Sequence, residues 1–397
     1  MRKPVALTLL ALSQVAVLAL WFAASAVAPA LAAQYALSGG QLALLTSAVQ
    51  AGFVAGSLTS AWTGLPDRFD PRRIYFIAAL LGAGANAAFL LVEPGTAASV
   101  ALRFVTGAAM AGVYPIGMKI AMSWAKDDAG LLVGLLVGAL TLGSASPHLF
   151  YFFGGVDWHF VIAASSVSAA AGGTIVLFLA TGPALRLSGR FNPSIMLQAW
   201  RNRGIRYANL GYFGHMWELY AMWAWVGAFL TASFATVELG AGAAKLAAFA
   251  TVAIGALGAV AGGAIADRIG RTTLTIAAMA VSGLCCLLAG TAFGAPAPVV
   301  IILCLVWGIA VIADSAQFSA SVAELAAPGT QGTMLTMQTA IGFALTLITI
   351  QLIPIFVDLL TWRYAFAPLA IGPFLGVLAM WRLRTLPEAQ ALAGGRR

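Results

Sequence analysis

The chain has 397 residues, of which 61% are hydrophobic and only 9% are charged. An ordinary soluble domain carries about 25% charged residues. This chain therefore has too few polar side chains to cover a surface in water, and we expect it to lie in a lipid bilayer. The composition excludes a basic nucleic-acid binder or a disordered tail, whose charges would lie in long polar segments.

Turn residues and charges divide the sequence into apolar segments of about 20 residues, the length that crosses a bilayer as a helix. The first resembles a cleavable signal peptide, because Arg2 and Lys3 precede its apolar run. We expect it to be retained, since the run is longer than a typical signal core. The prediction is an all-α integral membrane protein with twelve spans, at residues 6–31, 40–63, 74–92, 97–122, 130–153, 158–180, 207–233, 242–264, 273–293, 297–322, 332–356 and 363–383.

The basic residues predict the orientation of these spans, because short cytoplasmic loops collect Lys and Arg. With the N-terminus in the cytoplasm, all but three of the 21 Lys and Arg residues lie on or near the cytoplasmic side. The exceptions are Arg103, Lys245 and Arg363. We therefore expect both termini in the cytoplasm, and the net charge of +8 requires no nucleic-acid partner.

The longest polar stretch, residues 181–206, separates six spans from six and predicts a basic cytoplasmic linker. The domains predicted on either side are 1–180 and 207–397, the second including a cytoplasmic tail. Equivalent residues recur about 200 positions apart, which indicates a duplication. The matches are Asp67-Arg68 with Asp267-Arg268, Asp157-Trp158-His159 with Thr361-Trp362-Arg363, and Gly107 with Gly308.

The loops after spans 2 and 8 carry a motif of glycine, Asp-Arg, glycine and basic residues. Its better copy runs from Gly263 to Arg271, whereas the first copy has Asp70 where the second glycine would stand. Span 4 adds Arg103 followed by Gly107 and Gly112. In these motifs the chain resembles the major facilitator superfamily. The resemblance implies two pseudo-symmetric six-helix bundles and a secondary transporter that exposes a midplane site alternately to each side.

The motif residues are candidates for gating: Asp67, Arg68, Asp267, Arg268 and Arg271. A carboxylate at a helix end is attracted by the positive N-terminus of a neighbouring helix. By resemblance to the family, the neighbours of Asp67 and Asp267 are spans 11 and 5, so that the contacts would close the cytoplasmic side. The alternative is that these residues are ordinary polar turn residues.

Ionisable groups inside spans are costly and indicate function. Glu218 lies half-way along span 7, on one face with His215 and Trp225, and Asp314 lies in span 10. We expect Glu218 to bind and release the transported proton, and we consider a pairing of its carboxylate with Arg103 across the cavity. His215 would then tune that proton or contact the solute. Alternatively, Glu218 is paired with a basic residue for helix packing, His215 is an ordinary hydrogen-bonding partner, and Asp314 forms a salt bridge between the domains.

Further candidates for the solute site lie in spans 1, 4 and 11. Arg103 belongs by resemblance to a residue class linked with proton coupling, or else braces spans 1 and 4. Gln14 and Trp21 share a face of span 1 with Ser25, because they are spaced by seven and four residues. Gln338 begins a polar stripe in span 11 that also suits ordinary packing between helices.

The contrasting hypothesis is an enzyme, which would need clustered catalytic groups. The three histidines lie far apart, and no phosphate-binding glycine loop precedes a lysine. We therefore expect no catalytic residues, metal or cofactor. The three cysteines lie in apolar runs and are expected to be buried.

The function predicted is proton-coupled uptake of a small organic or anionic solute by a monomer in the plasma membrane, expected to be a bacterial inner membrane. The alternative is proton-driven efflux of amphiphilic or drug-like compounds. Tryptophans of span 7 would suit such compounds, and the glycines of span 5 partly resemble a motif of the family's antiporters.

Overall fold

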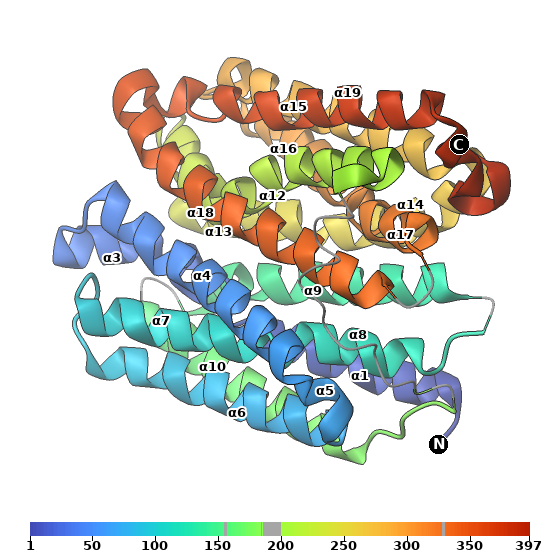
Figure 1. The fold of residues 1–397 in the computed structure, drawn as a ribbon. Helices are drawn as coiled ribbons and strands as arrows, with labels where there is room; N and C mark the ends of the chain where they lie inside the picture. Colours follow the sequence, from blue (N-terminus) through green and yellow to red (C-terminus); the bar gives the residue numbers. More distant parts are fainter. Residues whose placement is uncertain (127, 155–156, 184, 186–199, 328–329) are drawn as a thin grey trace.

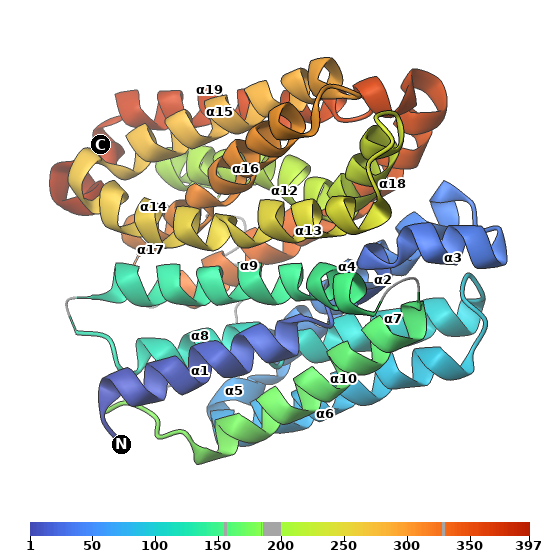
Figure 2. The same ribbon diagram turned by 180° about the vertical axis from the view of Figure 1, so that it is seen from behind.

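The computed structural model describes the 397 residues of the chain except 127, 155–156, 184, 186–199 and 328–329. The described residues form helices joined by short turns (Figure 1). Both termini lie at the same end of the molecule, which we name the terminal end, and the other end is named the opposite end (Figures 1 and 2).

The first bundle contains the first six predicted spans. Its helices are α1 (Lys3–Leu18), α2 (Ala23–Ala26), α3 (Ala28–Tyr35), α4 (Gly39–Thr63), α5 (Leu65–Arg68), α6 (Pro71–Ala88), η1 (Phe89–Leu91), α7 (Ala97–Met110), α8 (Tyr114–Met122), α9 (Ala129–Phe153), α10 (Trp158–Ile175) and η2 (Val176–Phe178).

The second bundle contains the other six. Its helices are α12 (Arg203–Ala235), α13 (Ala241–Ala253), α14 (Gly255–Ile269), α15 (Arg271–Ala292), α16 (Ala297–Ala313), α17 (Ser315–Leu325), α18 (Gln331–Tyr364), η3 (Ala367–Ala370), α19 (Ile371–Thr385) and η4 (Pro387–Gly395). Helix α12 begins inside the stretch predicted as a linker, most of which lies outside the described residues.

Nine helices in the described part of the chain are long and apolar enough to cross a membrane, or ten if the bent pair α19 and η4 is one span. The other predicted spans are the interrupted α1 to α3 and the α12 helix, whose middle is polar and rich in tryptophan. Each of the twelve predicted spans thus corresponds to helical structure, in the two bundles that the sequence predicts.

Several predicted spans are not continuous helices. The first was predicted without a break over 6–31, but the chain leaves the α-helix at residues 19–22, between α1 and α2. The fourth span breaks at residues 111–113, just before Pro115, whose ring has no N–H to continue the helix. The tenth breaks at Asp314, and the eighth is interrupted at Ile254. The breaks of spans 1 and 4 free backbone carbonyls that accept hydrogen bonds from side chains of other spans.

Glycines set how closely the helices pack, and their positions match the sequence duplication. A Cβ on Gly107 of α7 would lie 1.9 Å from the Val49 carbonyl oxygen, so only glycine fits there. Gly308 of α16 is placed in the same way, 1.8 Å from the Thr251 carbonyl oxygen. Spans 2 and 4 therefore cross as spans 8 and 10 do, in support of the duplication.

The bundles contact each other mainly along two pairs of spans, 5 with 8 and 2 with 11. Helix α9 lies beside α13 and α14, as Figure 2 shows, and Gly134 and Gly138 face Ala259 and Ala256 of α14. Small residues at these positions allow the two backbones to approach closely. Helix α4 packs on α18, where Gln351 donates a 2.9 Å hydrogen bond to Ser47.

Candidate functional site

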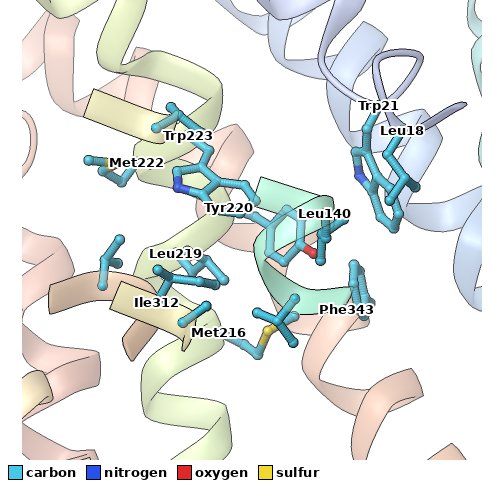
Figure 3. Packing of buried hydrophobic residues seen from close by; sticks show 14 of the residues in the cluster. Leu18, Trp21, Leu140, Met216, Leu219, Tyr220, Met222, Trp223, Ile312 and Phe343 are labelled. Carbon is cyan, nitrogen blue, oxygen red and sulfur yellow. The ribbon is translucent and has the colours of Figure 1, made fainter. Parts of the chain in front are cut away.

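The bundles meet near the centre of the molecule through aromatic rings. Trp21, in the break of span 1, lies with its ring centroid 5.0 Å from Phe53 of α4, 5.9 Å from Tyr220 of α12 and 5.6 Å from Phe343 of α18. Phe343 lies 4.5 Å from Phe53 and 4.9 Å from Tyr220. Trp21, Tyr220 and Phe343 approach one another from three segments in Figure 3. Phe53 and Phe343 were missed by sequence reasoning, because apolar rings carry no polar signal.

Two polar groups near these rings have no hydrogen-bond partner among the described residues. Trp21 Nε1 donates to Gln50 Oε1 at 3.2 Å, which leaves the buried Gln50 Nε2 unpaired. Trp223 packs edge-on against Phe22 at 5.9 Å, and its buried Nε1 is also unpaired. Such unpaired donors are costly inside a protein. We name these two donors together with Trp21, Phe22, Phe53, Tyr220 and Phe343 the central aromatic site.

Arg103 is fully buried and is bonded inside the first bundle. Its Nη1 donates to Asn86 Oδ1 at 2.6 Å, and its Nη2 donates to the Leu20 and Trp21 carbonyls at 3.0 and 3.1 Å. These two carbonyls lie where span 1 leaves the α-helix, so the break supplies the acceptors that a buried guanidinium needs. Arg103 therefore joins spans 1, 3 and 4.

Gln14 of span 1 binds the break of span 4, just as Arg103 of span 4 binds the break of span 1. Its Nε2 donates to the Val113 carbonyl, at the break of span 4, over 3.4 Å. Gln14 and Trp21 were expected on one face of span 1, but Gln14 contacts span 4 and Trp21 contacts span 2. The break between them changes the helical register on which that expectation rested. Ser25 is bonded to Thr46 of α4 at 2.6 Å.

Glu218 is buried inside the second bundle. Its carboxylate accepts hydrogen bonds from Ser282 at 2.9 Å, from Cys286 at 3.1 Å and from Trp307 Nε1 at 2.5 Å. These donors belong to α15 and α16, so Glu218 faces its own bundle. The contact with Arg103 that sequence reasoning considered is not made, because each group is bonded within its own bundle.

His215 and Asp314 are both buried and contact each other between spans 7 and 10, with Nδ1 and Oδ1 2.9 Å apart; the pair is ionic when the imidazole is protonated. Asp314 lies at the break between α16 and α17. Both residues are 201 positions beyond the partners Gln14 and Val113. The second bundle thus has an ionisable pair where the first has an amide and a carbonyl.

The two remaining candidates for the solute site are also bonded within the second bundle. Trp225 Nε1 donates to the Ile350 carbonyl at 3.1 Å. Gln338 donates to Asn209 Oδ1 at 3.0 Å and accepts from Ser319 at 3.2 Å. They therefore join α12, α17 and α18.

The gating candidates of the second bundle form a charged cluster at the terminal end. Arg271 donates to Glu324 at 2.6 and 2.9 Å and to Gln317 at 2.7 Å, and it lies 3.6 Å from Asp267. Asp267 lies beside the start of α9, where its Oδ2 would be 3.3 Å from a Cβ on Gly130. Arg268 is exposed. Chain residues near the C-terminus cover the cluster, since Arg396 donates to the Asp267 carbonyl at 2.5 Å.

The equivalent turn of the first bundle is built differently. Arg68 ends the short helix α5, and the side chain of Asp67 lies outside the described part of the structure. Asp70 accepts from the Arg72 backbone N–H at 2.9 Å and so caps α6. In the second bundle Gly270 occupies this position with φ 97°, a conformation that favours glycine.

Among the described residues, no three His, Cys, Asp or Glu side chains are grouped so that they could hold a metal ion. All three cysteines are buried and free, as expected from their apolar surroundings.

Solved transporters share this fold at low sequence identity. The nucleoside transporter NupG in its D323A form has a TM-score of 0.75 and 13% identity, over 96% of this chain and 100% of its own. A D-xylose-proton symporter has a TM-score of 0.74 and 15% identity, over 96% of this chain and 98% of its own. The E. coli xylose transporter XylE in a partially occluded inward-open conformation has a TM-score of 0.72 and 14% identity, over 95% of this chain and 99% of its own. These likenesses define the transporter fold.

The sequence itself identifies the family. The model of the Major Facilitator Superfamily matches residues 10–313, and the chain belongs to this family. No curated protein matches the chain. The resemblance seen in the motifs is thereby confirmed for the family, and the protein is an integral membrane secondary transporter.

Proposed function

We propose that the protein takes up a small organic solute together with protons and binds the solute at the central aromatic site. The observation that carries this proposal is the pair of unpaired buried donors, Gln50 Nε2 and Trp223 Nε1, beside aromatic rings from both bundles. Ring faces bind flat or cyclic solutes, and the two donors would orient a solute oxygen.

The charges favour an uncharged solute over an anionic one. The guanidinium of Arg103 binds oxygens of its own bundle, and the residues of the central aromatic site carry no charge. The solved structures named above are of transporters of nucleosides and D-xylose, which are uncharged hydroxylated rings. Solutes of both kinds would suit the aromatic rings and the two unpaired donors of the central aromatic site.

Glu218 is proposed as the group that binds the proton. Its hydrogen-bond partners are a hydroxyl, a thiol and an indole, none of which carries positive charge. A buried carboxylate without a bonded cation can alternate between its charged and neutral forms as its surroundings change. Movement of α12 against α15 and α16 would alter those surroundings during the transport cycle.

We further propose that both termini lie in the cytoplasm, with the membrane a bacterial inner membrane. The proposal rests on the basic residues, because all but three of the 21 would then lie on the cytoplasmic side. The terminal end is then the inner side of the protein and the opposite end the outer side.

A ligand screen followed by a transport assay tests this function. D-Xylose, uridine, small organic acids and cationic dyes are tested for thermal stabilisation of the purified protein. A ligand at 100 times its dissociation constant stabilises the folded state by about 2.7 kcal/mol. The best ligand is then given, radiolabelled, to proteoliposomes with an acidic outside, and Glu218→Gln should abolish accumulation but preserve exchange of labelled for unlabelled solute.

The matched control is Glu93→Gln, which makes the same chemical change at an exposed carboxylate. It should accumulate the solute at the wild-type rate. Wild-type accumulation by Glu218→Gln would exclude Glu218 as the proton site, and His215 and Asp314 would be examined next. Stabilisation by organic acids alone would contradict the uncharged solute.

Proton-driven efflux of an amphiphilic compound is the second candidate. It is favoured by the tryptophans of α12, where Trp217 also has a buried Nε1 without a partner among the described residues. The direction of the proton gradient separates the two functions, since efflux predicts accumulation in vesicles that are acidic inside.

A further inference from the structure

Helix α9 of the first bundle has both its ends against one span of the second bundle. At the inner end, Asp267 of α14 lies beside Gly130, the second residue of α9. At the outer end, Lys245 of α13 donates from Nζ to the Tyr151 carbonyl at 3.3 Å. Tyr151 is two residues before Phe153, the last residue of α9.

The charges at the two ends match the dipole of α9. A helix carries partial positive charge at its N-terminus and partial negative charge at its C-terminus. Its last four carbonyls have no partner inside the helix, and that of Tyr151 is among them. Asp267 therefore faces the positive end of α9 and Lys245 the negative end, both from the same span of the other bundle.

The surroundings of Lys245 are unusual for a lysine near the outer side. Its side chain is only 9% exposed, and its ammonium lies 3.5 Å from the centroid of the Tyr151 ring, a cation–π contact. A cavity of about 440 Å³ adjoins it, with a lining from both bundles that includes Gln34 and Thr231. If the bundles separate here, this cavity offers the ammonium a place to meet water.

We propose that Lys245 is the latch of the outer gate, and that it must leave the end of α9 for the transporter to open outward. The inference rests on the alternating access of the proposed function. Gly130, Gly134 and Gly138 pack α9 on α14 nearer the inner end. The inner contact can therefore persist while the outer one opens, and the loss of Asp267 would favour the reverse movement. The proposal explains why this lysine departs from the charge bias of the loops.

Cysteine labelling in right-side-out vesicles tests the latch without any solute. The reporter is Ser144→Cys, on α9 about two turns inside Tyr151, where the serine is 1% exposed and its hydroxyl has no partner among the described residues. The native cysteines are buried, and the protein without the reporter measures their background. A membrane-impermeant maleimide should label the reporter about two to five times faster in Lys245→Met, as expected for loss of one charge at a helix end.

One further variant tests the charge of Lys245, and another tests the inner contact. Lys245→Arg keeps the charge and should label at the parental rate, whereas Asp267→Asn should label more slowly, because loss of the inner contact favours the inward-open form. If Lys245→Met fails to elute as a folded protein, Lys245→Gln replaces it with the same expectation.

The outcomes distinguish the latch from the proposed function. Parental labelling in Lys245→Met, with slower labelling in Asp267→Asn, would overturn the latch but leave alternating access supported. Faster labelling in both Lys245→Met and Lys245→Arg would also overturn it, because the charge would not be what holds the gate. Parental rates in all variants would contradict both gates and alternating access between these bundles.

Discussion

The two bundles have a contact between spans at the same place, but its chemistry differs. In the first, Gln14 of span 1 donates to the Val113 carbonyl at the break of span 4. In the second, His215 of span 7 pairs with Asp314 at the break of span 10. Both bundles have a break in one span and a side chain of another span that contacts this break. Only the second contact involves two ionisable side chains, so equivalent positions of the two bundles carry different chemistry.

A second difference concerns how each bundle accommodates a buried ionisable group. Arg103 needs acceptors, and the break of span 1 supplies the Leu20 and Trp21 carbonyls. Glu218 needs donors, and the N–H groups inside a continuous helix are already used. The side chains of Ser282, Cys286 and Trp307 supply the donors instead. A broken span therefore suits the cation, whereas the carboxylate lies on the unbroken helix α12.

The largest loss of folding stability is expected at the contact whose chemistry differs between the bundles, His215 with Asp314. His215→Leu leaves the Asp314 carboxylate buried without its partner, which costs about 3 to 5 kcal/mol when a buried pair is broken. Gln14→Leu removes one donor from a neutral carbonyl and should cost only about 1 kcal/mol. Thermal unfolding of both variants in detergent measures the difference, and His215→Gln, which can still donate, serves as the control. Equal losses in the two leucine variants would contradict the comparison.

The next largest loss of stability should be the same in both bundles, because it concerns the two equivalent glycines. Gly107→Ala and Gly308→Ala each place a methyl group against a backbone carbonyl of the neighbouring span. Overpacking of this kind costs about 1 to 3 kcal/mol. Gly84→Ala is the matched control, because a Cβ on this helical glycine meets nothing within 4 Å. A large loss in only one bundle would show that the two crossings are not equivalent.

The smallest effect concerns the two turns at the terminal end. The hydrogen bond from the Arg72 side chain holds the pKa of Asp70 below its ordinary value. The ionised Asp70 carboxylate therefore stabilises the folded protein fully above the ordinary carboxyl pKa of about 3.9. This stabilisation is lost as the pH falls through the lowered pKa. Asp70→Asn keeps an acceptor for the cap, and we expect it to cost about 0.5 kcal/mol at pH 7, since the pair is partly exposed.

Thermal unfolding of Asp70→Asn at pH 7 and at about pH 3 measures this dependence. The difference from the wild type should shrink at the lower pH. The exposed carboxylate variant Glu93→Gln is the control and should show a smaller change. A loss that grew on acidification would have the wrong sign for a carboxyl whose pKa is lowered in the folded protein.

The spans and the family could be predicted from the sequence because both depend on local patterns. Twenty apolar residues between charges predict a spanning helix whatever its neighbours are. The Asp267-Arg268 motif and Gly107 with Gly308 are likewise read along the chain. Glu218 and Arg103 were found for the same reason, since an ionisable residue in an apolar run is visible without any contact.

The tertiary structure decided which of these groups meet. Spacing placed Gln14 and Trp21 on one face, but the break of span 1 turns them toward different spans. The sequence contains no distance between Glu218 and Arg103, and packing gives each its own partners. Phe53 and Phe343 reach Trp21 only because helices from the two bundles lie side by side.

The contacts of α9 show the same division. The sequence alone determined that Lys245 is one of the three basic residues away from the cytoplasmic side, and that Asp267 is the equivalent of Asp67 in the duplication. Only the packing of the two bundles placed these two charges at opposite ends of one helix. Hydropathy is a sum over neighbouring residues and is fixed by the chain, whereas a contact between spans depends on the approach of backbones distant in sequence.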